Sequence, residues 1–325
     1  MRIAVFGTGG VGGYFGGRLA ASGADVHFLA RGAHLAAMQS RGLRILSPLG
    51  DADIPRVDAT ADPAAIGPVD VVIFAVKLYD MQDAARMLAP LLGSNTVVIP
   101  LQNGVDAVDT LAAAVGAKHV AGGTAYISAL IAEPGVIRHT AIGRMTFGPV
   151  DGRHLDTLRE FHALCKRAGI DAVLSDRIFV DIWAKFARLT VFSGMTCIAR
   201  SPIGVIRDSP ALRALMEAAV HESVSVARGK QIPLPHSAYD DTLAGLRALP
   251  PQTRASMLED LERGRRLELP WLSGAIARIG DEVGVDTPTH DLFVALLEPH
   301  VNGKGPVTPS PLPVTDARIR NPSIS

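Results

Sequence analysis

The sequence predicts an α/β protein in two parts, a Rossmann-type doubly wound domain followed by a mostly α-helical domain. Apolar, strand-like runs alternate with helical segments through the first half of the chain. A G-x-G-x-x-G pattern stands between the first of these strands and the first helix. Beyond residue 155 helical periodicity replaces the alternation. Strands that alternate with helices are typical of a parallel sheet covered on both faces.

A glycine-rich turn organises the start of the chain. Residues 2–6 form a short apolar run suited to a buried parallel strand, and Gly7, Gly9 and Gly12 follow at once. Gly7 allows the tight turn, Gly9 lets a pyrophosphate approach the backbone, and Gly12 lets the next helix pack closely. The helix expected over 11–22 directs its free N–H groups at that phosphate. The pattern therefore predicts a dinucleotide site in preference to a purely structural turn.

The residues at the end of the second strand indicate which nicotinamide cofactor binds. Gly23 closes the helix, and the strand 25–30 follows, ending at Ala30 before Arg31. An NAD site typically has an acidic side chain here that binds the ribose 2′-hydroxyl, whereas a guanidinium can bind a 2′-phosphate through two hydrogen bonds. No acidic residue stands at this position, so the sequence predicts NADP(H) over NAD(H). The alternative is that Arg31 is a solvated surface residue.

Later strands also end at polar residues. The pattern predicts strands over 69–76, 96–101, 120–126 and 145–147, and helices over 33–40, over 80–92 and from 106. Lys77 follows the strand 69–76, and Asn103 follows the strand 96–101. Ligands of doubly wound sheets bind beyond the carboxyl ends of the strands. Because the glycine turn, Arg31, Lys77 and Asn103 all stand at such ends, we expect them to share one site.

The second half of the chain is expected to be helical. Periodic apolar residues predict helices over 155–168, 176–197, 210–229, 236–249, 253–263, 270–283 and 289–301. We therefore expect a nucleotide-binding domain over 1–152, a helical substrate domain over 153–301 and a poorly ordered tail over 302–325, where Pro, Ser and Gly are frequent. The long helices leave a homodimer open by analogy with other folds.

Composition limits the classes of partner. The chain of 325 residues carries 32 basic and 32 acidic side chains, so its formal net charge is zero. This balance argues against general binding of nucleic acid or membrane surfaces, and no apolar run approaches the ~20 residues that span a bilayer. The two cysteines, Cys165 and Cys197, indicate neither a disulfide framework nor a metal cluster. We expect a cytoplasmic protein that acts on a small molecule without a metal ion.

Two charged residues of the second half are candidates for chemistry. Lys185 stands in an apolar helical stretch, and Glu268 ends the charge-rich run 259–268. Considered by itself, such a lysine is more often a solvated residue whose stem covers apolar surface. Glu268 could equally belong to a hydrated helix face.

Several short motifs together resemble the ketopantoate reductase (2-dehydropantoate 2-reductase) family. They are GTGGVGG at 7–13, Arg31, VK at 76–77, QNGV at 102–105, WAK at 183–185, SML at 256–258, and Glu268 ahead of 271–274. The motifs span nearly the whole chain in the family's order. The glycine motif alone is unspecific, whereas the set Lys77, Asn103, Lys185, Ser256 and Glu268 is fairly specific.

The resemblance implies NADPH-dependent reduction of a 2-oxo acid to a 2-hydroxy acid, most directly ketopantoate to pantoate in pantothenate biosynthesis. It implies a site between the domains, in which Lys185 donates the proton and Glu268 contacts the nicotinamide-side ribose. Ser256 would touch the substrate carboxylate, and Ser193 would lie with Lys185 in the substrate site. The residues that match cofactor contacts are Gly7, Thr8, Gly9, Gly10, Val11, Gly12, Arg31, Lys77, Asn103, Ala129 and Glu268. A carboxylate such as Glu268 could also orient Lys185 for catalysis.

Three positions depart from the family pattern. Where the family has asparagines on and after the lysine helix, this chain has Leu189, Ser193 and Ile203. Leu189 and Ile203 cannot hydrogen-bond a carboxylate or hydroxyl, so a more apolar oxo compound is an alternative substrate. Arg188 and Arg200 are candidates to replace the lost carboxylate contacts. A non-catalytic NADP(H)-sensing protein is a further alternative, but it would need no proton donor, so the retained lysine argues against it.

Overall fold

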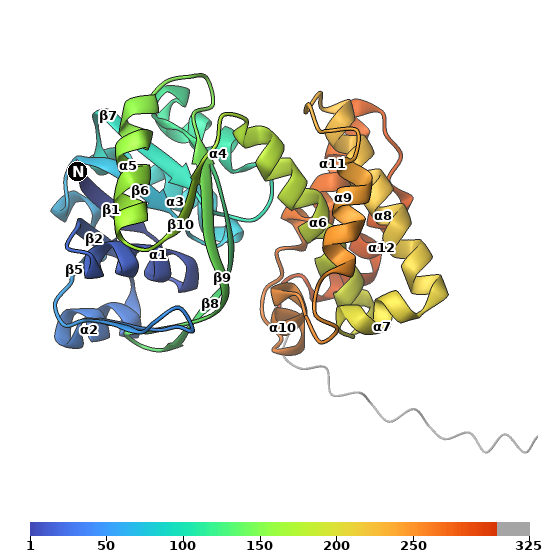
Figure 1. Ribbon diagram of the computed structural model, residues 1–325, viewed down its shortest axis with the longest axis horizontal. Helices are drawn as coiled ribbons and strands as arrows, with labels where there is room; N and C mark the ends of the chain where they lie inside the picture. Colours follow the sequence, from blue (N-terminus) through green and yellow to red (C-terminus); the bar gives the residue numbers. More distant parts are fainter. Residues whose placement is uncertain (304–325) are drawn as a thin grey trace, which may run out of the picture.

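The computed structural model describes residues 1–303 and has two lobes (Figure 1). The first lobe contains the strands, and the second is built from helices. Helix α6 (Ile178–Ala199) runs from the first lobe into the second. The predicted order, an α/β domain followed by helices, is confirmed. All but the first two residues of the expected tail 302–325 lie outside the described residues.

The first sheet is parallel, as predicted. Its strands lie in the order β5-β2-β1-β6-β7 and are β1 (Arg2–Phe6), β2 (Asp25–Leu29), β5 (Asp58–Thr60), β6 (Val69–Phe74) and β7 (Leu92–Pro100). Successive side chains of a strand point to opposite faces. Ile3 and Val5 accordingly enter one apolar core, whereas Ala4 and Phe6 enter another. Both faces of the sheet are therefore buried.

Helices and short turns connect these strands. The α-helices are α1 (Gly10–Ala21), α2 (Gly32–Arg41), α3 (Met81–Arg86) and α4 (Ala107–Val115), with 3-10 turns at Pro63–Ala65, Leu78–Asp80, Ala89–Leu91 and Ala117–His119. The prediction of a helix over 80–92 is therefore wrong in length, because the α-helix ends at Arg86. Pro90 lies in the turn that follows α3, and its missing N–H and fixed ring prevent an α-helix from continuing there.

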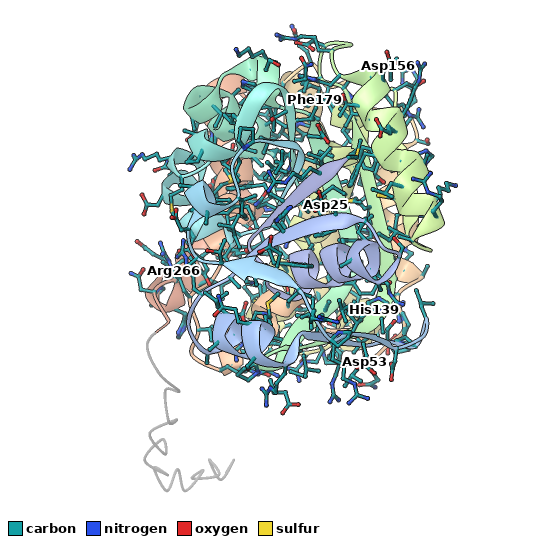
Figure 2. All side chains as sticks on the ribbon, turned by 90° about the vertical axis from the view of Figure 1, so that its left-hand side faces the viewer. Asp25, Asp53, His139, Asp156, Phe179 and Arg266 are labelled. Carbon is teal, nitrogen blue, oxygen red and sulfur yellow. The ribbon has the colours of Figure 1, made fainter. Side chains whose placement is uncertain are left out.

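The sequence pattern predicts only fragments of a second sheet. Its centre is an antiparallel hairpin of β8 (Gly122–Glu133) and β9 (Val136–Gly148); β9 also pairs with β3 (Leu43–Leu46) and β10 (Asp171–Leu174), and β3 pairs with β4 (Ala52–Ile54). The strands expected over 120–126 and 145–147 are the two ends of this hairpin. In Figure 2, Asp53 of β4 and His139 of β9 lie on the same side of the domain, below Asp25.

Helix α5 (Leu155–Arg167) and strand β10 pack within the first lobe. Phe161, Cys165 and Ala172 share an apolar core with Ile3 of the parallel sheet. Because β10 also extends the second sheet, cutting the chain at residue 152 would expose this core. We therefore propose that the domain boundary lies just before α6, later than the expected one.

The second lobe surrounds α6. Its other α-helices are α7 (Ile203–Asp208), α8 (Pro210–Gly229), α9 (Ala238–Arg247), α10 (Ser256–Glu262), α11 (Ser273–Val283) and α12 (Pro288–Leu297), with 3-10 turns at Leu269–Trp271 and Glu298–His300. Helix α6 packs against α8, α9, α10 and α12, so most of its side chains are buried. Among the described residues, no helix is both long and apolar enough to cross a bilayer.

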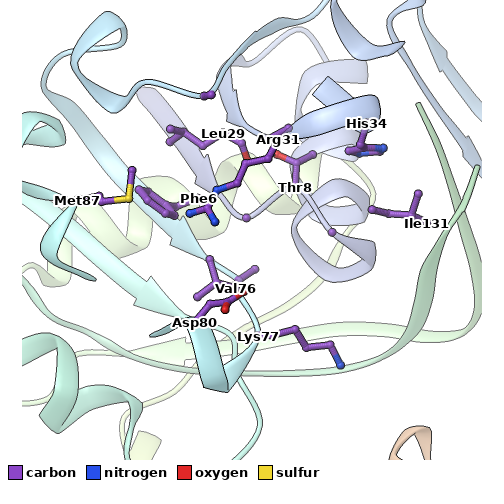
Figure 3. Close-up of a pocket in the computed structure, with 15 residues that line it drawn as sticks. Phe6, Thr8, Leu29, Arg31, His34, Val76, Lys77, Asp80, Met87 and Ile131 are labelled. Atoms are coloured by element: carbon purple, nitrogen blue, oxygen red, sulfur yellow. The ribbon is translucent and has the colours of Figure 1, made fainter. Parts of the chain in front are cut away.

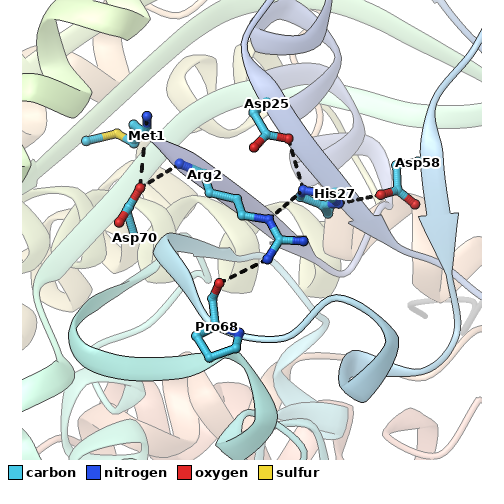
Figure 4. Close-up of polar contacts among 7 residues, drawn as sticks. All are labelled: Met1, Arg2, Asp25, His27, Asp58, Pro68 and Asp70. Carbon is cyan, nitrogen blue, oxygen red and sulfur yellow. Dashed lines mark hydrogen bonds and ion pairs between the residues drawn. The ribbon is translucent and has the colours of Figure 1, made fainter.

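A polar cluster holds the amino ends of the parallel strands together (Figure 4). Arg2 donates from Nε to Nε2 of His27 at 3.0 Å, and its backbone N–H donates to Asp70 at 2.6 Å. Nδ1 of His27 lies 2.5 Å from a carboxylate oxygen of Asp58, and Asp25 lies 3.0 Å from Nε2. These contacts tie β1, β2, β5 and β6 at the end of the sheet opposite to the glycine turn.

Candidate active site

The glycine turn adopts the geometry that its spacing predicts. Gly7 has a φ of +97°, which favours glycine, and an added Cβ at Gly12 would lie 2.3 Å from the carbonyl oxygen of Gly7. The hydroxyl of Thr8 donates to the carbonyl of Leu29 at 2.9 Å and ties the turn to the end of β2. At Gly9 an added Cβ would meet no atom of residues 1–303 within 4 Å. Gly9 therefore faces open space rather than a packed neighbour.

The next glycine has a role that the sequence does not reveal. A Cβ at Gly10 would lie 2.2 Å from the carbonyl oxygen of Ala129 on β8. The hairpin thus crosses directly over the first residue of α1. Val11 is half-buried against the first apolar core, so its side chain is a packing group. No described side chain caps the amino end of α1, so backbone N–H groups of its first turn have no partner within residues 1–303.

A pocket opens at the carboxyl ends of β1, β2 and β6 (Figure 3). It is lined by Phe6, Gly7, Thr8, Gly9, Leu29, Ala30, Arg31, His34, Ala61, Ala75, Val76, Lys77, Asp80, Met87 and Ile131. Arg31 is exposed at the N-cap of α2, and no carboxylate of residues 1–303 lies within 4 Å of its guanidinium. Asp80 lines the pocket from beyond β6, so the pocket contains an acidic side chain, although none stands at the end of the second strand, where an NAD site typically has one.

His34 is a pocket residue that the sequence analysis missed. Its Nδ1 accepts a hydrogen bond from the backbone N–H of Gly135, at the tip of the hairpin, over 3.0 Å. The Nε2 atom must then carry the proton of the neutral ring, and it is buried without a partner among the described residues. Burial lowers the pKa of His34, and the backbone of Thr8 partly opposes this. A lone histidine in the sequence carries no pattern that would mark it.

The two domains meet at a chain of three polar side chains. Lys185 of α6 donates from Nζ to Oδ1 of Asn103 at 3.0 Å, and Nδ2 of Asn103 donates to Oε2 of Glu268 at 3.3 Å. Lys185 and Glu268 are each only 8% exposed. The interpretations of Lys185 as a solvated stem and of Glu268 as part of a hydrated face are therefore wrong. Both side chains lie where the domains join.

Burial governs the charge on the lysine. Desolvation lowers the pKa of Lys185 to about 8, with Glu268 opposing the shift and Arg188 adding to it. A buried ammonium with a pKa near neutrality can both stabilise negative charge and give up its proton.

Lys77 also reaches across the domain junction. Its amine lies 3.6 Å from Asp260 and 3.9 Å from Glu268. Burial disfavours the charged form of Lys77, but Glu268 and Asp260 outweigh that effect and raise its pKa. On the same side, the guanidinium of Arg266 lies 4.7 Å from the ring centre of Tyr79. Lys77 therefore places a cation beside the pocket, close to two carboxylates of the helical domain.

The residues expected at the substrate site differ in how exposed they are. Ser193 is 1% exposed and lies two turns after Lys185 on α6. Ser256 is exposed as the first residue of α10, which packs against α6. Leu189 is half-buried one turn after Lys185. Ile203 is completely buried in the core of the helical domain. The side chain at this position is therefore not exposed to a ligand, and the absence of an amide there removes no exposed polar group.

The pocket fits a dinucleotide. The open space at Gly9, the free N–H groups of α1 and the guanidinium of Arg31, which has no carboxylate partner in the described part of the chain, suit phosphate groups. Within residues 1–303, no group of three or more His, Cys, Asp or Glu side chains could hold a metal ion.

Two family models match the chain. "Ketopantoate reductase PanE/ApbA" matches residues 3–152, and "Ketopantoate reductase PanE/ApbA C terminal" matches residues 177–300. The chain belongs to the ketopantoate reductase family. This family member is an oxidoreductase that uses a nicotinamide cofactor and acts on a small molecule.

Similar proteins cover almost the full length of this ketopantoate reductase family member. A 2-dehydropantoate 2-reductase of Mesorhizobium japonicum is 31% identical, with 91% of this chain and 97% of the relative covered. The structure of a 2-dehydropantoate 2-reductase from Geobacter metallireducens has a TM-score of 0.86 at 29% identity, with 92% and 99% covered. A D-mandelate dehydrogenase is 21% identical with a TM-score of 0.84, covering 92% and 98%, which shows a shared fold.

Proposed function

We propose that this protein reduces a 2-oxo acid to a 2-hydroxy acid with NADPH, and that 2-dehydropantoate is the first substrate to test. The observation that carries the proposal is the buried amine of Lys185, held by Asn103 at the domain junction. The relatives named 2-dehydropantoate 2-reductase, at about 30% identity over most of their length, support the reaction class.

The residues of the first domain would hold the cofactor. The N–H groups at the start of α1 and the open face of Gly9 would receive the pyrophosphate. Arg31 would bind the 2′-phosphate, with Lys77 as the second cation of the pocket. Glu268, which already accepts from Asn103, would lie beside the nicotinamide-side ribose. When bound, NADPH supplies a hydride to the ketone carbon.

Lys185 would act on the ketone oxygen. That oxygen gains negative charge as the carbon is reduced, so a nearby ammonium stabilises the transition state. Lys185 then transfers a proton to it and yields the hydroxyl group. Because Asn103 accepts one N–H of the amine, the other two are left to point at substrate. Glu268 would favour the ammonium form that this role requires.

The side chains beside Lys185 favour a second candidate substrate. Leu189 presents methyl groups one turn along α6, where an amide would suit the hydroxyl group of ketopantoate. A 2-oxo acid with an apolar side chain would meet no unpaired polar group there. We therefore include apolar and aromatic 2-oxo acids with ketopantoate among the substrates to test.

The test is NADPH oxidation by the purified protein with ketopantoate, 2-oxoisovalerate, 2-oxo-4-methylpentanoate and phenyl-2-oxoacetate. Turnover of ketopantoate supports the first candidate, and turnover of an apolar compound alone supports the second. An absence of turnover with every 2-oxo acid, while NADPH still binds, would leave a sensing role in place of a reductase.

Two further proposals concern the protein as a whole. A homodimer is supported by Leu292 and Leu296, which lie one turn apart on α12 and are 44% and 53% exposed. Light scattering over a range of concentrations tests the proposed homodimer.

A cytoplasmic location is supported by Cys165 and Cys197, which are free and buried. Fractionation of cells tests the proposed location.

A further inference from the structure

Helix α6 presents two cations against one aromatic ring. The amine of Lys185 lies 5.5 Å from the ring centre of Tyr126, and the guanidinium carbon of Arg188 lies 5.3 Å from the same centre. Residues three positions apart share a helix face. Tyr126 belongs to β8 of the first domain, so both positive charges meet at the domain junction.

Within residues 1–303, no anionic group balances the charge of Arg188. Arg188 is half-buried, and among residues 1–303 no carboxylate lies within 4 Å of it and no hydrogen-bond acceptor is found for it. By contrast, Arg278 at the junction lies 2.7 Å from Asp106. A half-buried cation beside a buried ammonium is costly unless an anion accompanies it.

The position of the guanidinium is restricted by packing. A Cβ at Gly245 of α9 would lie 3.0 Å from Nη1 of Arg188 and 3.1 Å from its Cδ. Arg188 therefore lies between α9 and the ring of Tyr126, with little room for a larger residue at Gly245. A side chain held in this way loses less conformational entropy when it binds a ligand.

A 2-oxo acid has the matching chemistry. Its carboxylate is bonded directly to the ketone carbon, so a substrate whose ketone oxygen faces Lys185 brings its carboxylate to a neighbouring cation. A guanidinium can bind a carboxylate through two parallel hydrogen bonds and so fix the plane of the adjoining ketone. Arg200, the other candidate from the sequence, lies at the C-cap of α6, about 20 Å further along the helix axis.

We infer that Arg188 binds the carboxylate of the substrate and thereby selects 2-oxo acids over neutral ketones. The inference rests on the proposed reductase function, because it places the ketone at Lys185. It assigns to this chain a carboxylate receptor on α6 itself, next to the proton donor. Leu189 then provides an apolar contact next to the guanidinium of Arg188. This combination suits a 2-oxo acid with an apolar side chain.

The test uses two unreactive compounds of similar shape. Oxamate has a carboxylate beside a carbonyl group, whereas oxamide carries no charge. Calorimetry with the NADP⁺-loaded protein should show that oxamate binds more tightly than oxamide. Arg188→Met should weaken oxamate about ten- to a hundredfold, as expected for a charge-assisted pair, and leave oxamide and NADPH binding unchanged. Arg188→Lys should retain part of the difference, and Arg200→Met should retain all of it.

Several outcomes would overturn the inference. One is oxamate binding that is equal in the wild type and Arg188→Met; another is a wild type that does not distinguish oxamate from oxamide. If Arg188→Met fails to fold, Arg188→Lys decides the matter, because loss of the bidentate geometry should still weaken oxamate measurably. A failure of the proposed function appears separately, as an absence of NADPH oxidation by the wild type with any 2-oxo acid.

Discussion

The amine of Lys185 donates a hydrogen bond to the side-chain oxygen of Asn103, 3.0 Å away across the domain junction. The amide nitrogen of Asn103 donates in turn to Glu268 at 3.3 Å. An amide both accepts and donates, so Asn103 orients the amine on one side and the carboxylate on the other. The packing of the two domains therefore sets the geometry of the Lys185 amine.

Replacing Lys185 by Met should abolish most turnover and leave the cofactor site intact. Loss of a positioned general acid typically lowers kcat by about 10²–10⁴-fold, and the methionine retains the apolar stem. The kcat with the best 2-oxo acid and the Kd of NADPH from fluorescence measure the two effects. Lys166→Met, on the exposed face of α5, is the control. Turnover near the wild-type value would remove Lys185 from its proposed role.

The rate of reduction should fall as the pH rises through about 8. Burial lowers the pKa of Lys185 to about 8, and only the ammonium present below that pH can donate a proton. The groups facing the amine are Glu268, Arg188, the neutral amide of Asn103 and the ring of Tyr126. Because Glu268 raises this pKa, Glu268→Gln should move the inflection to lower pH. A kcat profile that is flat across this range would contradict the prediction.

Alanine at two adjacent glycines should separate folding from cofactor binding. A Cβ at Gly10 would lie 2.2 Å from the carbonyl oxygen of Ala129, so Gly10→Ala should lower the free energy of unfolding by about 1–3 kcal/mol. A Cβ at Gly9 meets none of the described atoms within 4 Å, so Gly9→Ala should keep its Tm and weaken NADPH binding. Thermal unfolding and NADPH titration distinguish them. Equal Tm losses would show that Gly9 is also a packing position.

Two charged residues of the pocket should control cofactor choice in opposite directions. Arg31→Asp should weaken NADPH far more than NADH, by about tenfold or more, since only NADPH has the phosphate that a guanidinium can bind. Asp80→Asn should strengthen NADPH relative to NADH, because a carboxylate lining the pocket repels a phosphate. Kd values for both cofactors measure this. Equal weakening of both by Arg31→Asp would refute the preference for NADP(H).

His290 should make the fold sensitive to acid. It is completely buried, with Nε2 2.9 Å from the hydroxyl of Ser223 and 3.1 Å from the carbonyl of Ala219, and burial lowers its pKa to about 4. The unfolded chain binds this proton near pH 6.5, so the stability is present above that pH and is lost as the pH falls towards 4. The loss amounts to about 3 kcal/mol.

Urea unfolding at several pH values tests this role of His290. In His290→Gln the corresponding slope between pH 6.5 and 4 should disappear. The exposed His236 offers the matched control His236→Gln, which should unfold as the wild type does. The same acid sensitivity in His290→Gln would assign it to other groups.

Sequence alone determined the features that depend on neighbours along the chain. The glycine spacing specifies a turn between β1 and α1, because Gly7 needs a positive φ and Gly12 leaves no space for a Cβ. Periodic apolar residues likewise specify the parallel strands and the order of the two domains, since burial of one face is a local property of the pattern.

Only the tertiary structure decided which distant residues meet. Asp80 and His34 line the pocket at the glycine turn, and β9 pairs with β3 and β10, through contacts that no local pattern encodes. Asn103 is 82 positions from Lys185, and their hydrogen bond forms because α6 carries the lysine back against the end of β7. An isolated lysine in an apolar helix is ordinarily a surface residue; domain packing removes its water and brings its pKa close to neutrality.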